Sequence, residues 1–312
     1  MIEGVSRVAV IGTGTIGASW AAYFLAQGLE VAASDPAPGA ASFLHRFVEN
    51  AWPALERLGL APGADTGKLS FHAEPEEACE GAGFCQESGP ERETLKAEML
   101  ARLDAALPPD ALIASSSSNL LMTKMQALCK HPERCVLGHP FNPPHLIPLV
   151  EVVGGERTAP EAVERAIRFY KAVGKHPIRL NKEMPGHVSN RLQNALWREA
   201  AYLVEQGVVS VEDVDAAVCM GPGLRWALMG PIMTYNLAGG EGGLRYLLDH
   251  IGVAHIWPEL GTPEMTREFE DRLIAGVQAE AGGRSIPELA RERDRKLLGI
   301  LDAVRTKEGD HG

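Results

Sequence analysis

The sequence predicts an α/β fold with a mostly parallel sheet, followed by a second, all-helical C-terminal domain. Apolar runs typical of buried strands alternate with helix-period segments as far as Leu180, which is the pattern of a parallel sheet with helices on both faces. After Pro185 the strand patterns stop and helical periodicity takes over. We therefore expect one domain at residues 1–184 and another at residues 185–312.

A glycine-rich turn follows the first expected strand. Gly12, Gly14 and Gly17 form a G-x-G-x-x-G motif directly after the apolar run 8–11. The first glycine lets the chain turn, the second leaves room for a pyrophosphate, and the third lets the next helix pack close to the sheet. Asp35 ends the second apolar run, where a carboxylate binds ribose hydroxyls and repels a 2′-phosphate. The pattern predicts a Rossmann-type domain that binds NAD rather than NADP.

The other elements follow from the same periodicities. We expect strands at residues 8–11, 31–34, 83–86, 112–115, 136–138, 149–153 and 177–180, helices at 16–27 and 40–58, and a loop at 61–67. In the second domain helical periodicity covers residues 188–204, 211–220 and the chain from 232 onward.

Composition excludes several classes of partner. The chain has 312 residues, 45% of them hydrophobic, which is enough for two cores. Its net charge of −11 argues against nucleic acid and anionic membranes. No apolar run approaches the roughly 20 residues of a membrane span, so we expect a cytoplasmic protein. Five cysteines without a C-x-x-C predict reduced thiols, and Cys129, His131 and Cys135 match no common zinc spacing, so no metal is expected.

Two titratable residues fall at the expected carboxyl edge of the sheet. His139 ends a strand where ligands gather on open α/β sheets, and Glu151 lies in an otherwise apolar strand. A buried carboxylate is costly without a partner, and a histidine returning over a proline turn is a suitable one. Such a pair acts as a general base with an oriented ring. The alternative is that each residue is structural. Similarly, the serines at 115–118 either bind a substrate oxygen or cap the helix expected near Leu120.

These motifs together resemble the L-3-hydroxyacyl-CoA dehydrogenase family. The resemblance is collinear from about Arg7 to Tyr235 and is carried by the glycine motif with Asp35 and by the segments 86–88, 115–119, 138–143, 149–153 and 185–191. It implies an NAD-dependent oxidoreductase acting on a CH–OH group. It also implies a helical domain that closes the cleft and forms a homodimer.

The resemblance assigns roles to single residues. It implies that His139 is the catalytic base, that Glu151 orients it, and that Ser118 and Asn190 bind the reacting oxygen. Arg92 stands where the family commonly has lysine. With the glycine fingerprint, the expected cofactor contacts are Gly12, Gly14, Thr15, Ile16, Gly17, Asp35, Glu87 and Arg92.

The substrate is expected to be small. Residues 36–82 contain only Arg46, Arg57 and Lys68 as permanent cations, which are few for the phosphates of CoA. The segments 223–227, 229–231 and 237–243 resemble the branch of the family that oxidises L-carnitine. That resemblance implies L-carnitine, or a similar 3-hydroxy acid, as the substrate.

Carnitine carries a quaternary ammonium, which binds over aromatic faces, and a carboxylate, which arginine recognises. Candidate residues are Phe141, Trp197, Trp226 and Tyr235 for the cation and Arg191 and Arg225 for the carboxylate. Core packing is the alternative for the aromatic residues, and a helix-end cation is the alternative for Arg225. A 3-hydroxyacyl-CoA or L-gulonate 3-dehydrogenase, and a non-enzymatic NAD-binding protein like a lens crystallin of this family, remain alternative functions.

Overall fold

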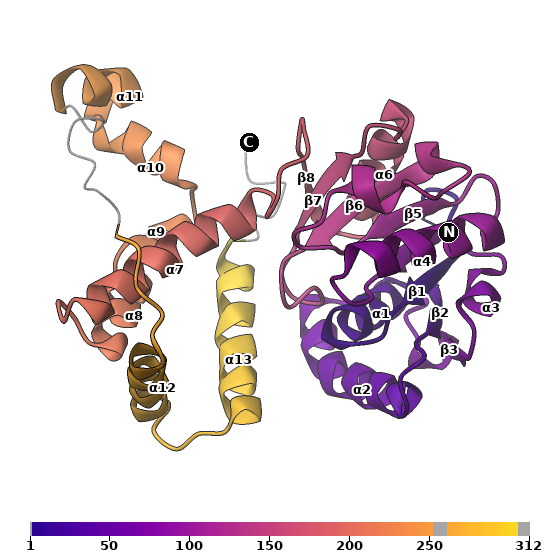
Figure 1. The fold of residues 1–312 in the computed structure, drawn as a ribbon, viewed down its shortest axis with the longest axis horizontal. Helices are drawn as coiled ribbons and strands as arrows, with labels where there is room; N and C mark the ends of the chain where they lie inside the picture. The colour runs from indigo at the N-terminus through magenta and orange to yellow at the C-terminus, as the bar shows by residue number, and fades with distance from the viewer. Residues whose placement is uncertain (1, 252–260, 305–312) are drawn as a thin grey trace. The chain divides into compact units, whose positions relative to one another are not determined.

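The structure, a computed structural model, describes residues 2–251 and 261–304. The chain divides into two compact units, Met1–Arg191 (unit 1) and Leu192–Gly312 (unit 2). Unit 1 contains the sheet, and the regular elements among the described residues of unit 2 are all helices (Figure 1). The predicted fold class is confirmed.

Unit 1 is built on one eight-stranded sheet in the order β3-β2-β1-β4-β5-β6-β7-β8. All neighbouring strands pair parallel except β6 and β7, which are antiparallel. The strands are β1 Arg7–Ile11, β2 Glu30–Ser34, β3 Leu69–His72, β4 Phe84–Glu87, β5 Leu112–Ser115, β6 Cys135–Pro140, β7 Leu149–Gly154 and β8 His176–Arg179. The seven expected strands are present. The edge strand β3 was not predicted, because its four half-buried residues form neither an apolar run nor a clear alternation.

Helices cover both faces of the sheet in unit 1. They are α1 Thr15–Ala26, α2 Ala40–Leu58, α3 Pro75–Cys79, α4 Glu93–Ala106, α5 Met122–Met125 and α6 Pro160–Ala172. One buried cluster joins the sheet to α1, α2 and α6, and a second joins the opposite face to α3, α4 and α5. Along β1, Val8 and Val10 belong to the first cluster and Ala9 to the second, as the twofold alternation of a strand requires.

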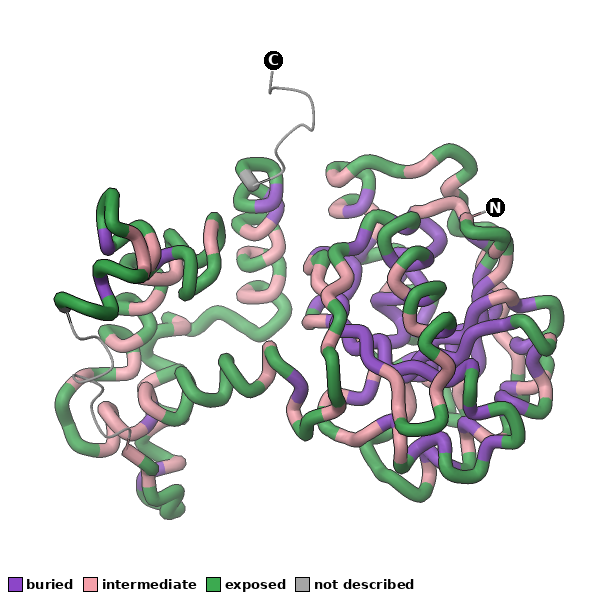
Figure 2. Tube along the Cα trace, turned by 90° about the horizontal axis from the view of Figure 1, so that it is seen from above, coloured by how far each residue is buried: buried purple, intermediate pink, exposed green. Residues whose placement is uncertain are grey.

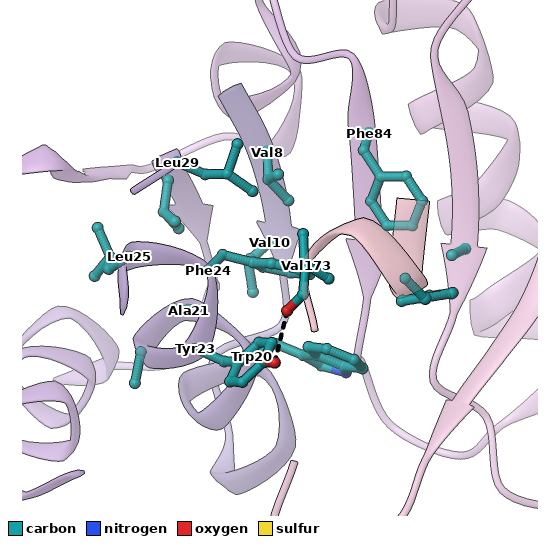
Figure 3. Close-up of a cluster of buried hydrophobic side chains, with 14 of the residues drawn as sticks. Val8, Val10, Trp20, Ala21, Tyr23, Phe24, Leu25, Leu29, Phe84 and Val173 are labelled. Atoms are coloured by element: carbon teal, nitrogen blue, oxygen red, sulfur yellow. Dashed lines mark hydrogen bonds between the residues drawn. The ribbon is translucent and has the colours of Figure 1, made fainter. Parts of the chain in front are cut away.

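Helix α1 is held against the sheet by an aromatic cluster (Figure 3). Trp20 stacks on Phe24 with ring centroids 5.0 Å apart, and Phe24 meets Phe84 edge-on. The Tyr23 hydroxyl donates a hydrogen bond of 2.6 Å to the Val173 carbonyl. The aromatic pairs contribute about 0.5–1.5 kcal/mol each beyond their buried area, so the start of α1 is set firmly at the end of β1.

Unit 2 contains the other helices: the greater part of α7 Ser189–Glu205, and α8 Val211–Cys219, α9 Pro222–Trp226, α10 Pro231–Ala238, α11 Gly243–Tyr246, a π-helical turn Leu247–Ile251, α12 Arg267–Ala281 and α13 Ile286–Val304. Its residues are far less buried than those of unit 1 (Figure 2). Many of its large apolar side chains are exposed, among them Trp197, Ile232 and Ile286. Among the described residues, we find no helix with the length and apolar character needed to cross a membrane.

Candidate active site

The glycine turn between β1 and α1 leaves open space at one of its three glycines. A Cβ on Gly12 would lie 2.7 Å from the Ser88 carbonyl carbon, and one on Gly17 would lie 1.8 Å from the Gly12 oxygen. A Cβ on Gly14 would meet no protein atom within 4 Å. Packing within unit 1 therefore requires glycine at the first and third positions. The second position, which is also the N-cap of α1, borders space in which a phosphate group fits.

Asp35 follows β2 and is bonded to the glycine turn. Its Oδ2 accepts a hydrogen bond of 2.7 Å from the Thr13 amide, and its Oδ1 accepts one of 2.8 Å from the Ala37 amide. A carboxylate has about four acceptor sites, so each oxygen retains a lone pair for a further donor. This arrangement suits the two hydroxyls of an adenosine ribose.

His139 and Glu151 form a buried pair on neighbouring strands. The antiparallel register of β6 and β7 places them opposite one another, and His139 Nδ1 lies 2.8 Å from Glu151 Oε2. The other carboxylate oxygen, Oε1, accepts hydrogen bonds of 2.9 and 3.0 Å from the amides of Val188 and Ser189. The structure therefore brings together the two residues that the sequence predicted to pair.

The environment keeps Glu151 ionised. Burial raises the pKa of its carboxyl, but the hydrogen bonds from His139, Ser189 and Val188 outweigh burial and hold the pKa below its ordinary value. An ionised carboxylate only accepts hydrogen bonds, so the proton of a neutral His139 lies on Nδ1. Nε2 then carries the lone pair that a general base needs.

A second histidine, which sequence reasoning missed, lies against His139. The ring centroids of His187 and His139 are 5.1 Å apart, and His187 is almost fully buried with a left-handed φ of 49°. Its Nε2 lies 3.1 Å from the Ser117 carbonyl, so the proton of this ring is on Nε2. Burial is the largest effect on the pKa of His187 and lowers it, so this imidazole is neutral. Its only sequence signal was its place in the segment 185–191.

Ser118 and Asn190 are also brought together. Ser118 follows β5 in the serine-rich turn, and the Asn190 side chain donates a hydrogen bond of 3.2 Å from Nδ2 to the Ser118 carbonyl. Both residues are half-buried. Because His187 binds the neighbouring Ser117 carbonyl, the turn is linked on one side to the His139 and Glu151 pair.

The structure gives Glu87 a partner that the sequence did not suggest. Glu87 is buried at the end of β4, and Lys96 Nζ lies 2.8 and 2.9 Å from its two carboxylate oxygens. The Ser115 hydroxyl and the Gly89 amide also donate to this carboxylate, each at 2.6 Å. Arg92 is exposed at the N-cap of α4. The contacts of Glu87 and Arg92 with the cofactor stay predictions.

The expected substrate residues divide between the two units. Half-buried Phe141 and exposed Arg191 belong to unit 1, whereas Arg225 and Trp226 of α9 and Tyr235 of α10 are exposed in unit 2. Trp197 lines a mostly apolar cavity of about 480 Å³ between α7, α8 and α12. Their contacts with a substrate stay predictions.

Of the three residues weighed for zinc, Cys129 and Cys135 are buried with sulfurs 3.9 Å apart, and His131 is exposed.

Comparison with known proteins identifies the family. Residues 7–184 match the NAD binding domain of 3-hydroxyacyl-CoA dehydrogenase, and residues 186–275 match the C-terminal domain of the same enzyme. This chain belongs to the 3-hydroxyacyl-CoA dehydrogenase family. The predictions of an NAD cofactor and of an oxidoreductase are confirmed with it.

Individual relatives are similar over nearly their full length. The chain is 54% identical over 304 residues to the L-carnitine dehydrogenase of Streptomyces coelicolor, covering 97% of this chain and 96% of that protein. It is 48% identical over 313 residues to that of Pseudomonas putida, covering 100% and 98%. A similar solved structure is the NAD+-dependent dismutase 5-formyl-3-hydroxy-2-methylpyridine 4-carboxylic acid 5-dehydrogenase, with a TM-score of 0.82, 32% identity, and 97% and 100% coverage.

Proposed function

We propose that this protein oxidises the C3 hydroxyl of L-carnitine to 3-dehydrocarnitine, with NAD as the hydride acceptor. Its similarity to L-carnitine dehydrogenases over nearly the whole chain supports the substrate. The observation that carries the chemistry is the buried His139 and Glu151 pair, 2.8 Å apart, at the same edge of the sheet as the glycine turn.

The residues present fit NAD. Gly14 borders open space at the start of α1, and Asp35 retains acceptor sites beside the same turn. Thr15 and Ile16 form the first turn of α1, where free amides favour a pyrophosphate. When bound, NAD accepts the hydride that leaves C3 of the substrate.

The proton is handled by the protein. His139 Nε2 takes the proton from the C3 hydroxyl, while Glu151 holds Nδ1–H and stabilises the imidazolium that forms. Ser118 and Asn190 hold the reacting oxygen within reach of the base. Because His187 stays neutral, a second positive charge does not oppose the charging of His139.

The two ends of carnitine require different partners. We propose that aromatic faces hold the trimethylammonium group, because they attract a cation that donates no N–H hydrogen bond, and Phe141, Trp197, Trp226 and Tyr235 are each candidates for this contact. We propose that Arg191 or Arg225 binds the carboxylate.

An acyl-CoA substrate is less well supported. Lys68, one of three permanent cations in residues 36–82, donates hydrogen bonds to the carbonyls of Gly28 and Gly63. A cation held in this way contributes less to binding CoA phosphates.

We also propose that the protein acts as a homodimer, as the family resemblance implies. Light scattering of the purified protein tests this proposal, and a monomeric mass would reject it.

A substrate panel tests the proposed function. Initial rates of NADH formation are measured with L-carnitine, D-carnitine, L-gulonate and 3-hydroxybutyrate, and NADH consumption with acetoacetyl-CoA. We expect L-carnitine to give the highest kcat/KM. In the same assay, His139→Gln is expected to lower kcat by orders of magnitude with an unchanged Kd for NAD. Higher kcat/KM for another hydroxy acid or for acetoacetyl-CoA would refute the substrate, and an active His139→Gln variant would refute the base.

A further inference from the structure

Glu91 holds the serine-rich turn through a single carboxylate oxygen. It lies in the loop between β4 and α4, and its Oε1 accepts a hydrogen bond of 2.6 Å from the Ser117 hydroxyl. The same oxygen accepts from the backbone amides of Ser118, Asn119 and Leu120 at 3.1, 2.9 and 3.3 Å. The carboxylate therefore sits in a concave group of four donors.

Successive backbone amides that point to one side form a site for an anion. Here the anion is the protein's own glutamate, and hydrogen bonds to an ionised acceptor are about twice as strong as neutral ones. The Ser117 hydroxyl also accepts a hydrogen bond of 3.0 Å from the Leu120 amide, which closes the turn. Residues 118–120 thus have their amides directed at Glu91, and Ser117 adds its hydroxyl.

The carbonyl groups of the same turn bind residues of the proposed reaction site. His187 donates to the Ser117 carbonyl at 3.1 Å, and Asn190 donates to the Ser118 carbonyl at 3.2 Å. The turn is therefore held on its amide side by Glu91 and on its carbonyl side by His187, which precedes α7, and by Asn190 in the first turn of α7. A change in the peptide planes of the turn would displace both.

A buried cation connects Glu91 to the sheet. Lys96 Nζ lies 3.9 Å from Glu91 Oε2 and 2.8 Å from Glu87 Oε1 at the end of β4. Lys96 is buried, whereas the Glu91 side chain is about one-third exposed. The charge of Lys96 thus balances two carboxylates. This contact fixes Glu91 relative to β4, the strand beside β5.

We propose that Glu91 is a positioning residue for the dehydrogenase reaction. It sets the peptide planes of residues 117–120, and through them the places of Ser118, Asn190 and His187 beside His139. Glu91 itself does not touch the substrate. The inference rests on the proposed function, because Ser118 and Asn190 have roles in the reaction only there.

Three variants test this role: Glu91→Ala removes the acceptor, Glu91→Gln keeps one acceptor oxygen without the charge, and Glu98→Ala changes an exposed glutamate of α4. Because small misplacements of reacting groups cost up to about 100-fold in rate, we expect Glu91→Ala to lower kcat by about 10- to 100-fold. We expect Glu91→Gln to recover most of that loss and Glu98→Ala to match the wild type. The Kd for NAD and the pH profile should not change.

Amide hydrogen exchange gives a readout that does not depend on the substrate. In Glu91→Ala, exchange at residues 118–120 should accelerate while that of the β5 strand stays protected. If Glu91→Ala keeps the wild-type kcat, or if its kcat falls only in step with global unfolding, the positioning role is overturned.

If the wild type oxidises another 3-hydroxy acid and not L-carnitine, the proposed substrate fails. The same comparison of variants on that acid then decides the role of Glu91. If the wild type oxidises none of the panel, both proposals fail.

Discussion

The replacement Glu151→Gln tests the orientation of the proposed base most directly. Three donors face the carboxylate of Glu151: Nδ1–H of His139 on one oxygen, and the amides of Val188 and Ser189 on the other. A carboxamide has one oxygen and one NH2 group, so it cannot accept from both directions. The direction in which the carboxamide oxygen points decides whether His139 or the two backbone amides keep an acceptor.

The arrangement that disables the base is the more stable. If the amide oxygen faces Val188 and Ser189, the NH2 group donates to His139 Nδ1, and the ring proton moves to Nε2. Every hydrogen bond is then made, but Nε2 has no lone pair for the substrate hydroxyl. The opposite arrangement restores the base but leaves two part-buried N–H groups without acceptors, at about 1–3 kcal/mol each.

The variant must therefore adopt an arrangement about 2–6 kcal/mol less stable in order to react, which corresponds to a fall in kcat of about 30- to 25 000-fold. The assay is NADH formation from L-carnitine, with the Kd for NAD and the melting temperature measured in parallel, and the exposed Glu156→Gln serves as the matched control. We expect the Kd for NAD to be unchanged. A Glu151→Gln variant with at least half of the wild-type kcat would refute the orienting role of the carboxylate.

The same carboxylate predicts a pH effect on stability. The pKa of Glu151 is lower in the folded protein than its ordinary value, so the unfolded chain binds the proton first as the pH falls. Its contribution is therefore complete above the ordinary titration range of glutamate and is lost as the pH falls through the lowered pKa. Thermal unfolding of the wild type in acid should show this loss, and the difference in stability from Glu151→Gln should narrow there.

Three further predictions concern the cofactor and the base. Gly14→Ala should weaken NAD binding at an unchanged melting temperature, whereas Gly17→Ala should lower the melting temperature, because only the second added Cβ meets protein backbone; equal unfolding in both would contradict this. Asp35→Ala should raise the Kd for NAD by about tenfold, the equivalent of one charge-assisted hydrogen bond, and bring the affinities for NAD and NADP closer. Unchanged cofactor preference in binding titrations would remove Asp35 from the ribose. Oxidation should accelerate from acid to alkaline pH, because His139 must be neutral and a proton is released; a flat rate profile across neutrality would exclude a histidine base.

Much of the first unit followed from local sequence. The helix predicted at residues 40–58 has the observed bounds, because its apolar residues recur on one face and Gly59 ends it in a conformation with φ of 100°. The strand β3 escaped prediction because its pairing with β2 at the sheet edge, rather than its own composition, stabilises it. The boundary expected after residue 184 lies between the two matched family domains, whereas the compact units meet at residues 191 and 192.

The sequence predicted residues of the site only where it showed the energetic cost of burying a charge or the position of a residue along a strand. Glu151 stood out because a carboxylate inside an apolar strand needs a partner, and His139 stood at the end of a neighbouring strand. Glu91 and Lys96 gave no such signal, because charged residues at the start of a helix are ordinary on a protein surface. Their roles arise from the fold of the loop before α4, which turns one acid towards three backbone amides. Backbone donors have no sequence code, so groups that position a reacting residue through them become visible only in three dimensions.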